Sequence, residues 1–260
     1  MKKSILFIFT ACFLFTTSCS DFLDEEHKTK YSSEYVFGTP EGLKLAVNAL
    51  YALQRYYAND TENATIFALE RGTDLAVTNG GTGNFYGIYD PNYLKPSASQ
   101  VGFMWRTMYQ IIGKANEIIA AAEDLEDTPS LRATVSEAKC FRAQSYFLLY
   151  RTFDRIWLNI QPTTAENVND PRDFHAASEK EVFDLIYEDL EYAITNLDWV
   201  SDEAGRFTQA AARHMKAKAA LWLKDWDTTL EQVEEIEKSG HFDLIALNEV
   251  FNAGDLNHKE

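Results

Sequence analysis

Apolar side chains recur every three or four residues along most of this chain, which is the spacing of one face of an α-helix. Between residues 101 and 122 they stand, for example, at Met104, Met108 and Ile112. The pattern predicts seven helices. They are expected over residues 39–54, 63–69, 101–122, 128–149, 178–197, 208–222 and about 226–240.

Local signals mark where several of these helices begin and end. Thr39 can cap a helix whose first two positions are proline and glutamate, both of which favour a helix start. Ser178 and Glu181 have the spacing of a capping box, and Thr208 precedes another apolar stripe. Gly240 is expected to end the last helix.

Three segments break the helical pattern. Residues 20–38 are expected to form an extended lead-in, and residues 156–172 a connector. Residues 78–99 are too rich in Gly, Asn and Pro for a helix, which predicts a long loop. Long loops in compact domains are usually functional or disordered.

These elements predict an all-α fold. The later helices form antiparallel pairs joined by short turns, such as Lys224-Asp225. Small alanines on one helix and large residues on the next suit α-solenoid-like, tetratricopeptide-type helix pairs, here with long irregular ligand loops. Trp105, Trp222 and Trp226 lie on helical stripes and are expected in the core.

Composition and charge exclude some classes of function. The chain has 260 residues, of which 46 % are hydrophobic, enough for a substantial core. Its 24 basic and 40 acidic residues give a net charge of −16. This excess of acid argues against nucleic acid as a partner, because phosphates are bound by Lys and Arg.

The N-terminus reads as a secretory signal peptide over residues 1–18. Lys2 and Lys3 precede an apolar stretch too short for a membrane span, which needs about 20 apolar residues. Cys19 follows small residues, as the lipidated cysteine of a bacterial lipoprotein does, although an ordinary signal peptide cleaved nearby is the alternative. Cys140 is then the only other cysteine left, and it is expected to be a small buried hydrophobe.

The loop over residues 78–99 carries the best candidates for ligand contact. Its aromatic residues offer flat apolar faces, and the amides between them offer hydrogen-bonding groups. The alternative is that these aromatics only pin the loop onto the helices. The candidate ligand-binding residues are Asn79, Asn84, Phe85, Tyr86, Tyr89, Asn92 and Tyr93.

Catalytic and cofactor patterns are missing. The glycines at 80, 81 and 83 are not followed by the Lys-Ser/Thr of a P-loop, and no histidine pair has zinc spacing. No cofactor, metal or catalytic residue is therefore expected. A glycoside hydrolase, which needs two carboxylates about 5–9.5 Å apart, ranks lowest among the alternatives.

Five stretches in order resemble the SusD/RagB family of nutrient-binding outer-membrane lipoproteins. They cover the chain from Cys19 to about Leu247. The chain departs from the family pattern after the fourth expected helix, where residues 154–158 replace a Gly-containing turn and a Pro-Leu pair. The five stretches are residues 19–24, 105–116, 137–149, 189–197 and 205–226.

The resemblance implies a binding protein rather than an enzyme. Family members are anchored by lipid to the outer face of the outer membrane. They capture glycans, or in some cases peptides, and deliver them to a SusC-like TonB-dependent transporter. The loop at 78–99 is similar to the region from which the family contributes ligand contacts. The resemblance therefore implies that its aromatic rings stack on sugar rings and that its amides bind the hydroxyls. Acidic residues after Cys19 resemble the export signal of surface lipoproteins of Bacteroidetes.

Matched to the family, the chain divides into a signal peptide at 1–18, an extended tether at 19–38 and an N-terminal helical domain at 39–260. The C-terminal half of the family is absent from this sequence. The alternative function is a lipid-anchored helical-repeat scaffold that binds protein partners in the periplasm. Trp157, in the connector, is a weak candidate for a transporter contact.

Overall fold

The computed structural model describes residues 31–59, 95, 97, 99–153, 155–171 and 174–244. Every regular element in these ranges is a helix, which confirms the predicted all-α fold. The helices are α2 (Ser33–Gly38), α3 (Pro40–Asn59), α5 (Ser99–Ala122), α6 (Pro129–Thr152), α7 (Glu179–Asn196), α8 (Gln209–Leu223) and α9 (Trp226–Lys238).

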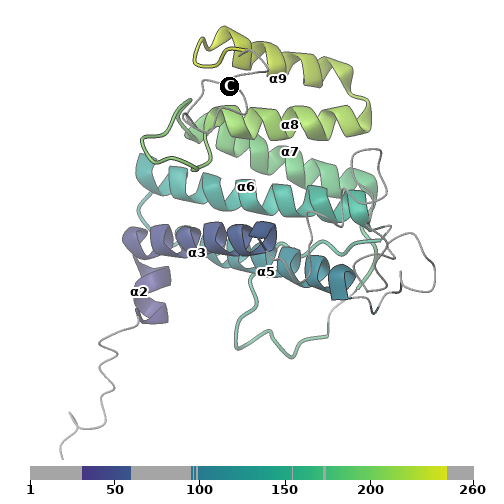
Figure 1. Cartoon of the computed structure of the whole chain (residues 1–260). Coiled ribbons are helices and arrows are strands. Elements are labelled where there is room, and N and C mark those ends of the chain that lie inside the picture. Colours follow the sequence, from purple (N-terminus) through teal and green to yellow (C-terminus); the bar gives the residue numbers. More distant parts are fainter. Residues whose placement is uncertain are drawn as a thin grey trace, which may run out of the picture.

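From α5 to α9, each helix packs against the next one in the sequence, and the stack rises in chain order in Figure 1. Helix α3 packs against both α5 and α6. The core lies where α3, α5, α6 and α7 meet, and Leu50, Ile112, Phe141, Tyr146 and Ile186 are all fully enclosed there. None of the described helices has both the length and the apolar content needed to cross a bilayer.

The predicted helix starts are confirmed where the structure describes them. The Thr128 hydroxyl accepts a hydrogen bond from the Leu131 N–H at 3.2 Å, and Thr208 caps α8 in the same way. Ser178 and Glu181 form both halves of the predicted capping box. The α8–α9 turn contains Lys224 in the left-handed region (φ 61°), and α9 ends just before Gly240 (φ 68°).

The extended lead-in predicted for residues 20–38 is wrong for its last part. Ser33–Gly38 forms the short helix α2, which is capped by the Ser32 hydroxyl and packs on α3. The two helices approach so closely at Gly42 that a Cβ there would lie 2.6 Å from the Val36 Cα. Glycine is therefore required at this contact.

The predicted core position of Trp222 and Trp226 is also wrong. Their exposed fractions are 48 % and 56 %, and Leu230 and Val233, three residues apart on α9, are exposed as well. Of the described helices, α9 packs against α8 alone, and the residue of α9 that is buried there is Gln232. Helical spacing predicted an apolar stripe, but no second described helix covers it.

The predicted helix at 63–69 lies outside the described residues. So does most of the predicted loop at 78–99.

Candidate functional site

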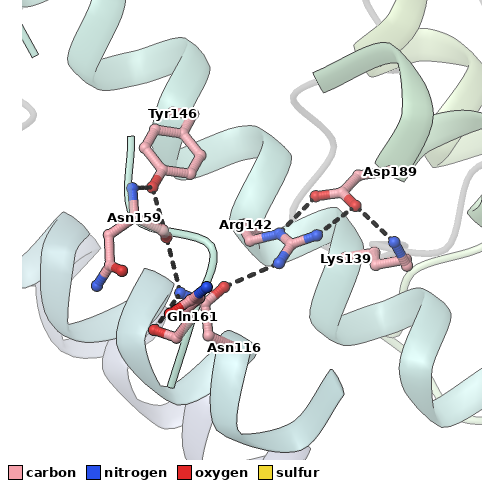
Figure 2. A network of polar contacts seen from close by, with 7 residues as sticks. All are labelled: Asn116, Lys139, Arg142, Tyr146, Asn159, Gln161 and Asp189. Atoms are coloured by element: carbon pink, nitrogen blue, oxygen red, sulfur yellow. Dashed lines mark hydrogen bonds and ion pairs between the residues drawn. The ribbon is translucent and has the colours of Figure 1, made fainter. Parts of the chain in front are cut away.

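A buried ion cluster joins α6 to α7. Asp189 is completely enclosed, and its carboxylate binds Arg142 through two parallel hydrogen bonds of 2.7 and 2.8 Å. Lys139 Nζ lies 2.8 Å from the same carboxylate. Figure 2 shows Asp189 between these two cations. Paired, fully hydrogen-bonded charges of this kind fix the geometry around them.

The cluster continues through Asn116 to the connector. Arg142 donates from Nη1 to the Asn116 side-chain oxygen at 2.8 Å, and Asn116 donates from Nδ2 to the Asn159 carbonyl at 2.8 Å. The sequence predicts a backbone partner for Asn116 and a carboxylate partner for Arg142, and both are confirmed. The network therefore links the packing of α5, α6 and α7 to the position of the connector.

Two tyrosine hydroxyls hold alternate residues of the connector. The Tyr146 hydroxyl donates to the Asn159 carbonyl and accepts from the Asn159 N–H, both at 2.8 Å (Figure 2). Tyr109 makes the same pair of bonds with Trp157, at 2.8 and 2.9 Å. Burial raises the pKa of both tyrosines, so each hydroxyl keeps its proton and both bonds persist at neutral pH.

The connector residues clamped in this way line a cleft of about 260 Å³. Trp157, Asn159 and Gln161 are spaced two apart and all contribute to its wall. Asn167 closes the other side, and its side chain accepts from the Thr164 N–H at 2.8 Å and donates to the Pro162 carbonyl at 3.0 Å. The Trp157 ring itself packs against Phe174, with 4.9 Å between the centroids.

This arrangement suits the recognition of a polar ring. Trp157 provides an aromatic surface, Asn159 and Gln161 provide amides, and Asp170 adds a carboxylate. Because the connector is bound through its backbone, the amide side chains remain available to a ligand. Preorganised polar groups of this kind reduce the entropy lost on binding.

The sequence identified only one residue of this cleft. Trp157 was singled out, but as a transporter contact, whereas Asn159, Gln161, Asn167 and Asp170 were missed. The available signal was the Trp-x-Asn-x-Gln spacing at residues 157–161, which places three recognition side chains on alternate positions.

The other predicted site residues lie outside the described residues, and the structure does not test them. They are Cys19, Asn79, Asn84, Phe85, Tyr86, Tyr89, Asn92 and Tyr93. Cys140 is fully buried as predicted, and burial raises the pKa of its thiol well above the usual range, so it is unreactive. Within the described ranges, no three His, Cys, Asp or Glu side chains gather closely enough to hold a metal ion.

Stacked helices around one core define this chain as an all-α protein with an α-solenoid-like architecture. A family model for SusD-like proteins, described as "Starch-binding associating with outer membrane", matches residues 21–221. The match covers most of the chain, and the chain therefore belongs to the SusD-like family of carbohydrate-binding proteins.

Curated relatives agree with this assignment. A SusD-like protein of Bacteroides ovatus is 28 % identical over 240 residues, which are 87 % of this chain and 40 % of the relative. SusD-like protein P38 of Formosa agariphila is 27 % identical over 252 residues, or 94 % of this chain and 48 % of the relative. The chain thus spans less than half the length of these two relatives.

Solved structures share the fold. A SusD superfamily protein of Bacteroides vulgatus superposes with a TM-score of 0.73 at 17 % identity, covering 86 % of this chain and 49 % of that one. A laminarin-binding SusD-like protein gives a TM-score of 0.68 at 23 % identity, covering 79 % and 46 %. A structure with a bound xylogluco-oligosaccharide gives 0.64 at 22 % identity, covering 78 % and 41 %.

Proposed function

We propose that this protein captures oligosaccharides or polysaccharides at the cell surface and delivers them to a SusC-like TonB-dependent transporter, without hydrolysing them. The observation that carries the proposal is the connector cleft. It combines an aromatic ring with two amides, Asn159 and Gln161, on a backbone clamped by buried tyrosines. Membership of the SusD-like family and two structural neighbours with named glycans support the same ligand class.

The ligand surface is proposed to include the loop predicted from the sequence. Phe85, Tyr86, Tyr89 and Tyr93 would stack on sugar rings, and the amides at 79, 84 and 92 would bind hydroxyls. Trp157 and its neighbours would supply a second group of contacts. Attachment to the outer membrane is proposed through lipid on Cys19, with the protein facing the outside of the cell.

A glycan panel tests the binding function. The purified full chain should be retarded in native gels that contain its polysaccharide, and no reducing sugar should be released. Asn159→Ala removes an amide but keeps the backbone bonds to Tyr146, and it should weaken binding about tenfold, as expected for one or two lost hydrogen bonds. The double substitution Tyr86→Ala, Tyr89→Ala should also weaken binding while leaving helix content intact.

Tyr31→Ala is the control for the aromatic substitutions, because this tyrosine is exposed and lies outside the cleft. It should leave retardation unchanged. Retardation that no cleft or loop variant alters would reject the proposed surface. Reducing-sugar release would reject the assignment as a binding protein.

Protease shaving of intact cells tests the location. A surface lipoprotein is released, whereas a periplasmic scaffold is spared. Cys19→Ala should abolish incorporation of labelled palmitate and the association with membranes.

A further inference from the structure

A second cavity, which shares no lining residue with the connector cleft, is lined by side chains of α3, α5, α6, α7 and α8. Its volume is about 220 Å³, below the ~300 Å³ at which pockets for drug-sized ligands begin, so it suits a single ring or a small group. The floor is apolar and includes Met108 and Leu190. The polar groups come from α3, α6 and α8.

The charges that line this cavity are all positive. Arg151 and Lys218 both contribute to its wall, and none of the lining residues is acidic. This is unusual for a chain with a net charge of −16. Among the described residues, neither cation has an ion-pair partner. The local field therefore favours an anion.

The Arg151 guanidinium is positioned for such a ligand by an aromatic ring. Its guanidinium stacks over the Phe147 ring, 4.5 Å from the ring centroid. Stacking fixes the plane of the group and leaves the N–H groups at its edge able to bind a carboxylate with two parallel bonds. Partial burial lowers the pKa of Arg151.

Tyr57 gives an independent indication of a missing ligand. Its side chain lines the cavity, only 5 % of the residue is exposed, and its hydroxyl has no hydrogen-bond partner among the described residues. Buried polar groups are almost always satisfied, so an orphan hydroxyl in a cavity wall points to a partner that binds there. Burial raises the pKa of Tyr57 to about 12, so the hydroxyl is a donor at neutral pH.

We infer that this cavity binds the carboxylate-bearing ring of an acidic saccharide, a hexuronate. Arg151 and Lys218 would bind the carboxylate, Tyr57 would donate to it or to a ring oxygen, and the amides of Gln54 and Gln144 would bind the hydroxyls. The inference rests on the proposed glycan-binding function and assigns an acidic residue of the glycan to a site separate from the connector cleft.

Titration of the full chain with glucuronate and galacturonate, followed by NMR, tests this inference. Both should bind at least about tenfold more tightly than glucose, because a charged hydrogen-bonding pair is lost with the neutral sugar. Arg151→Gln and Lys218→Gln should each weaken the binding of hexuronate about tenfold. Lys114→Gln is the control, since Lys114 is an exposed cation outside the cavity lining, and it should have no effect.

Tyr57→Phe separates a ligand contact from a structural role. The variant keeps the stacking of the ring on Phe103 and removes a hydroxyl without a partner, so the fold should be at least as stable. Its affinity for hexuronate should nevertheless fall. Unchanged affinity in Tyr57→Phe and in Arg151→Gln would overturn the inference, as would equal binding of glucose and glucuronate.

Two further measurements show whether the hexuronate inference alone is wrong or the proposed glycan-binding function as well. If inorganic sulfate or acetate binds as tightly as glucuronate, the cavity is a general anion site and the saccharide assignment is wrong. Neutral glycan retardation, measured on the same variants, should be unaffected. A chain that is retarded by neutral glycans but does not bind hexuronate refutes this inference alone, whereas a chain that binds neither refutes the proposed function as well.

Discussion

At the scale of single residues, Asp189 is the anion between two buried cations. Replacing it with alanine would leave Arg142 and Lys139, both buried residues, without their counter-ion. Removing one partner of a buried ion pair typically costs about 3–5 kcal/mol. Asp189→Ala should therefore lower the free energy of unfolding by about this amount, measured by urea denaturation monitored by circular dichroism.

The exposed pair Lys180–Asp184 provides the comparison for that experiment. Both side chains are more than half exposed, and pairs of this kind contribute about 0.5 kcal/mol or less. Asp184→Ala should barely shift the denaturation midpoint. If both variants lose a similar amount of unfolding free energy, the Asp189 cluster contributes no more to stability than a surface ion pair does.

Glu137 introduces a dependence of stability on pH. Burial raises the pKa of this carboxyl above its ordinary value of 4.5, although a hydrogen bond from Tyr51 and the nearby Arg206 act in the opposite direction. The folded protein thus holds the proton more tightly than the unfolded chain. The stability that this group contributes is present below pH 4.5 and is lost as the pH rises through the folded pKa.

Glu137→Gln removes this titration and keeps an oxygen that can accept from Tyr51. Compared with the variant, the unmodified protein should lose stability as the pH rises above 4.5. Urea denaturation of both proteins at a series of pH values measures the difference. A difference that grows in favour of the unmodified protein over this interval would contradict the assigned direction.

Some of these residue-level features could be read from the sequence. A polar or charged side chain on an apolar helix face must find a partner, which is why a carboxylate was predicted for Arg142 and a backbone group for Asn116. The identity of the partners was not predictable. Asp189 is 47 residues away from Arg142, and Asn159 is 43 residues away from Asn116, so only the packing of the helices brings them together.

At the scale of elements, the predicted helix caps were confirmed. The predicted burial of Trp226 on α9, which depends on packing between helices, was wrong. Capping at Thr128, Ser178 and Thr208 depends on contacts within three residues, and the sequence contains all of that information. The outward face of α9 depends instead on whether another helix lies beside it. Helical periodicity at Trp226 and Leu230 cannot answer that question, and the predicted burial was wrong.

The connector shows how an element without regular structure is kept in place. Tyr146→Phe would remove two hydrogen bonds to Asn159 and leave its N–H and carbonyl without that partner. The variant should lose about 1–2 kcal/mol of stability. Amide hydrogen exchange of residues 157–161 should accelerate more than exchange in α7.

Tyr187→Phe is a suitable control for the connector. The Tyr187 hydroxyl is buried and has no hydrogen-bond partner within the described part of the chain, so its removal breaks no bond. Exchange in the connector should stay unchanged. Equal acceleration in both variants would mean that loss of a buried hydroxyl, rather than the clamp on Asn159, loosens the segment.

At the scale of the whole molecule, the candidate ligand surface has two parts, and the sequence predicted one of them far better than the other. The loop aromatics at 85–93 were predicted from composition, because glycine, asparagine and tyrosine gather there. The connector cleft was largely missed, because Trp157 and Asn159 are set in place by tyrosines on α5 and α6. Composition can indicate a binding loop, but a preorganised cleft can be identified only when the fold is known.

In the part of the chain that the structure describes, an apolar stripe on helix α9 is left uncovered. Trp226, Leu230 and Val233 are spaced four and three residues apart, which places them on one face, and their exposed fractions are 56 %, 59 % and 44 %. Contiguous apolar surface of this kind is a site of association. We expect the purified chain to self-associate as its concentration rises.

The double substitution Leu230→Gln, Val233→Gln should reduce this association, because it removes apolar area from the exposed stripe and touches no buried contact of α9. The free energy of unfolding should stay within about 0.5 kcal/mol, as is usual for surface positions. Sedimentation equilibrium over a range of concentrations measures the change. Glu231→Gln, exposed on the same helix but outside the stripe, serves as the control. If the control reduces association as much as the double variant, charge on α9 is responsible rather than its apolar stripe.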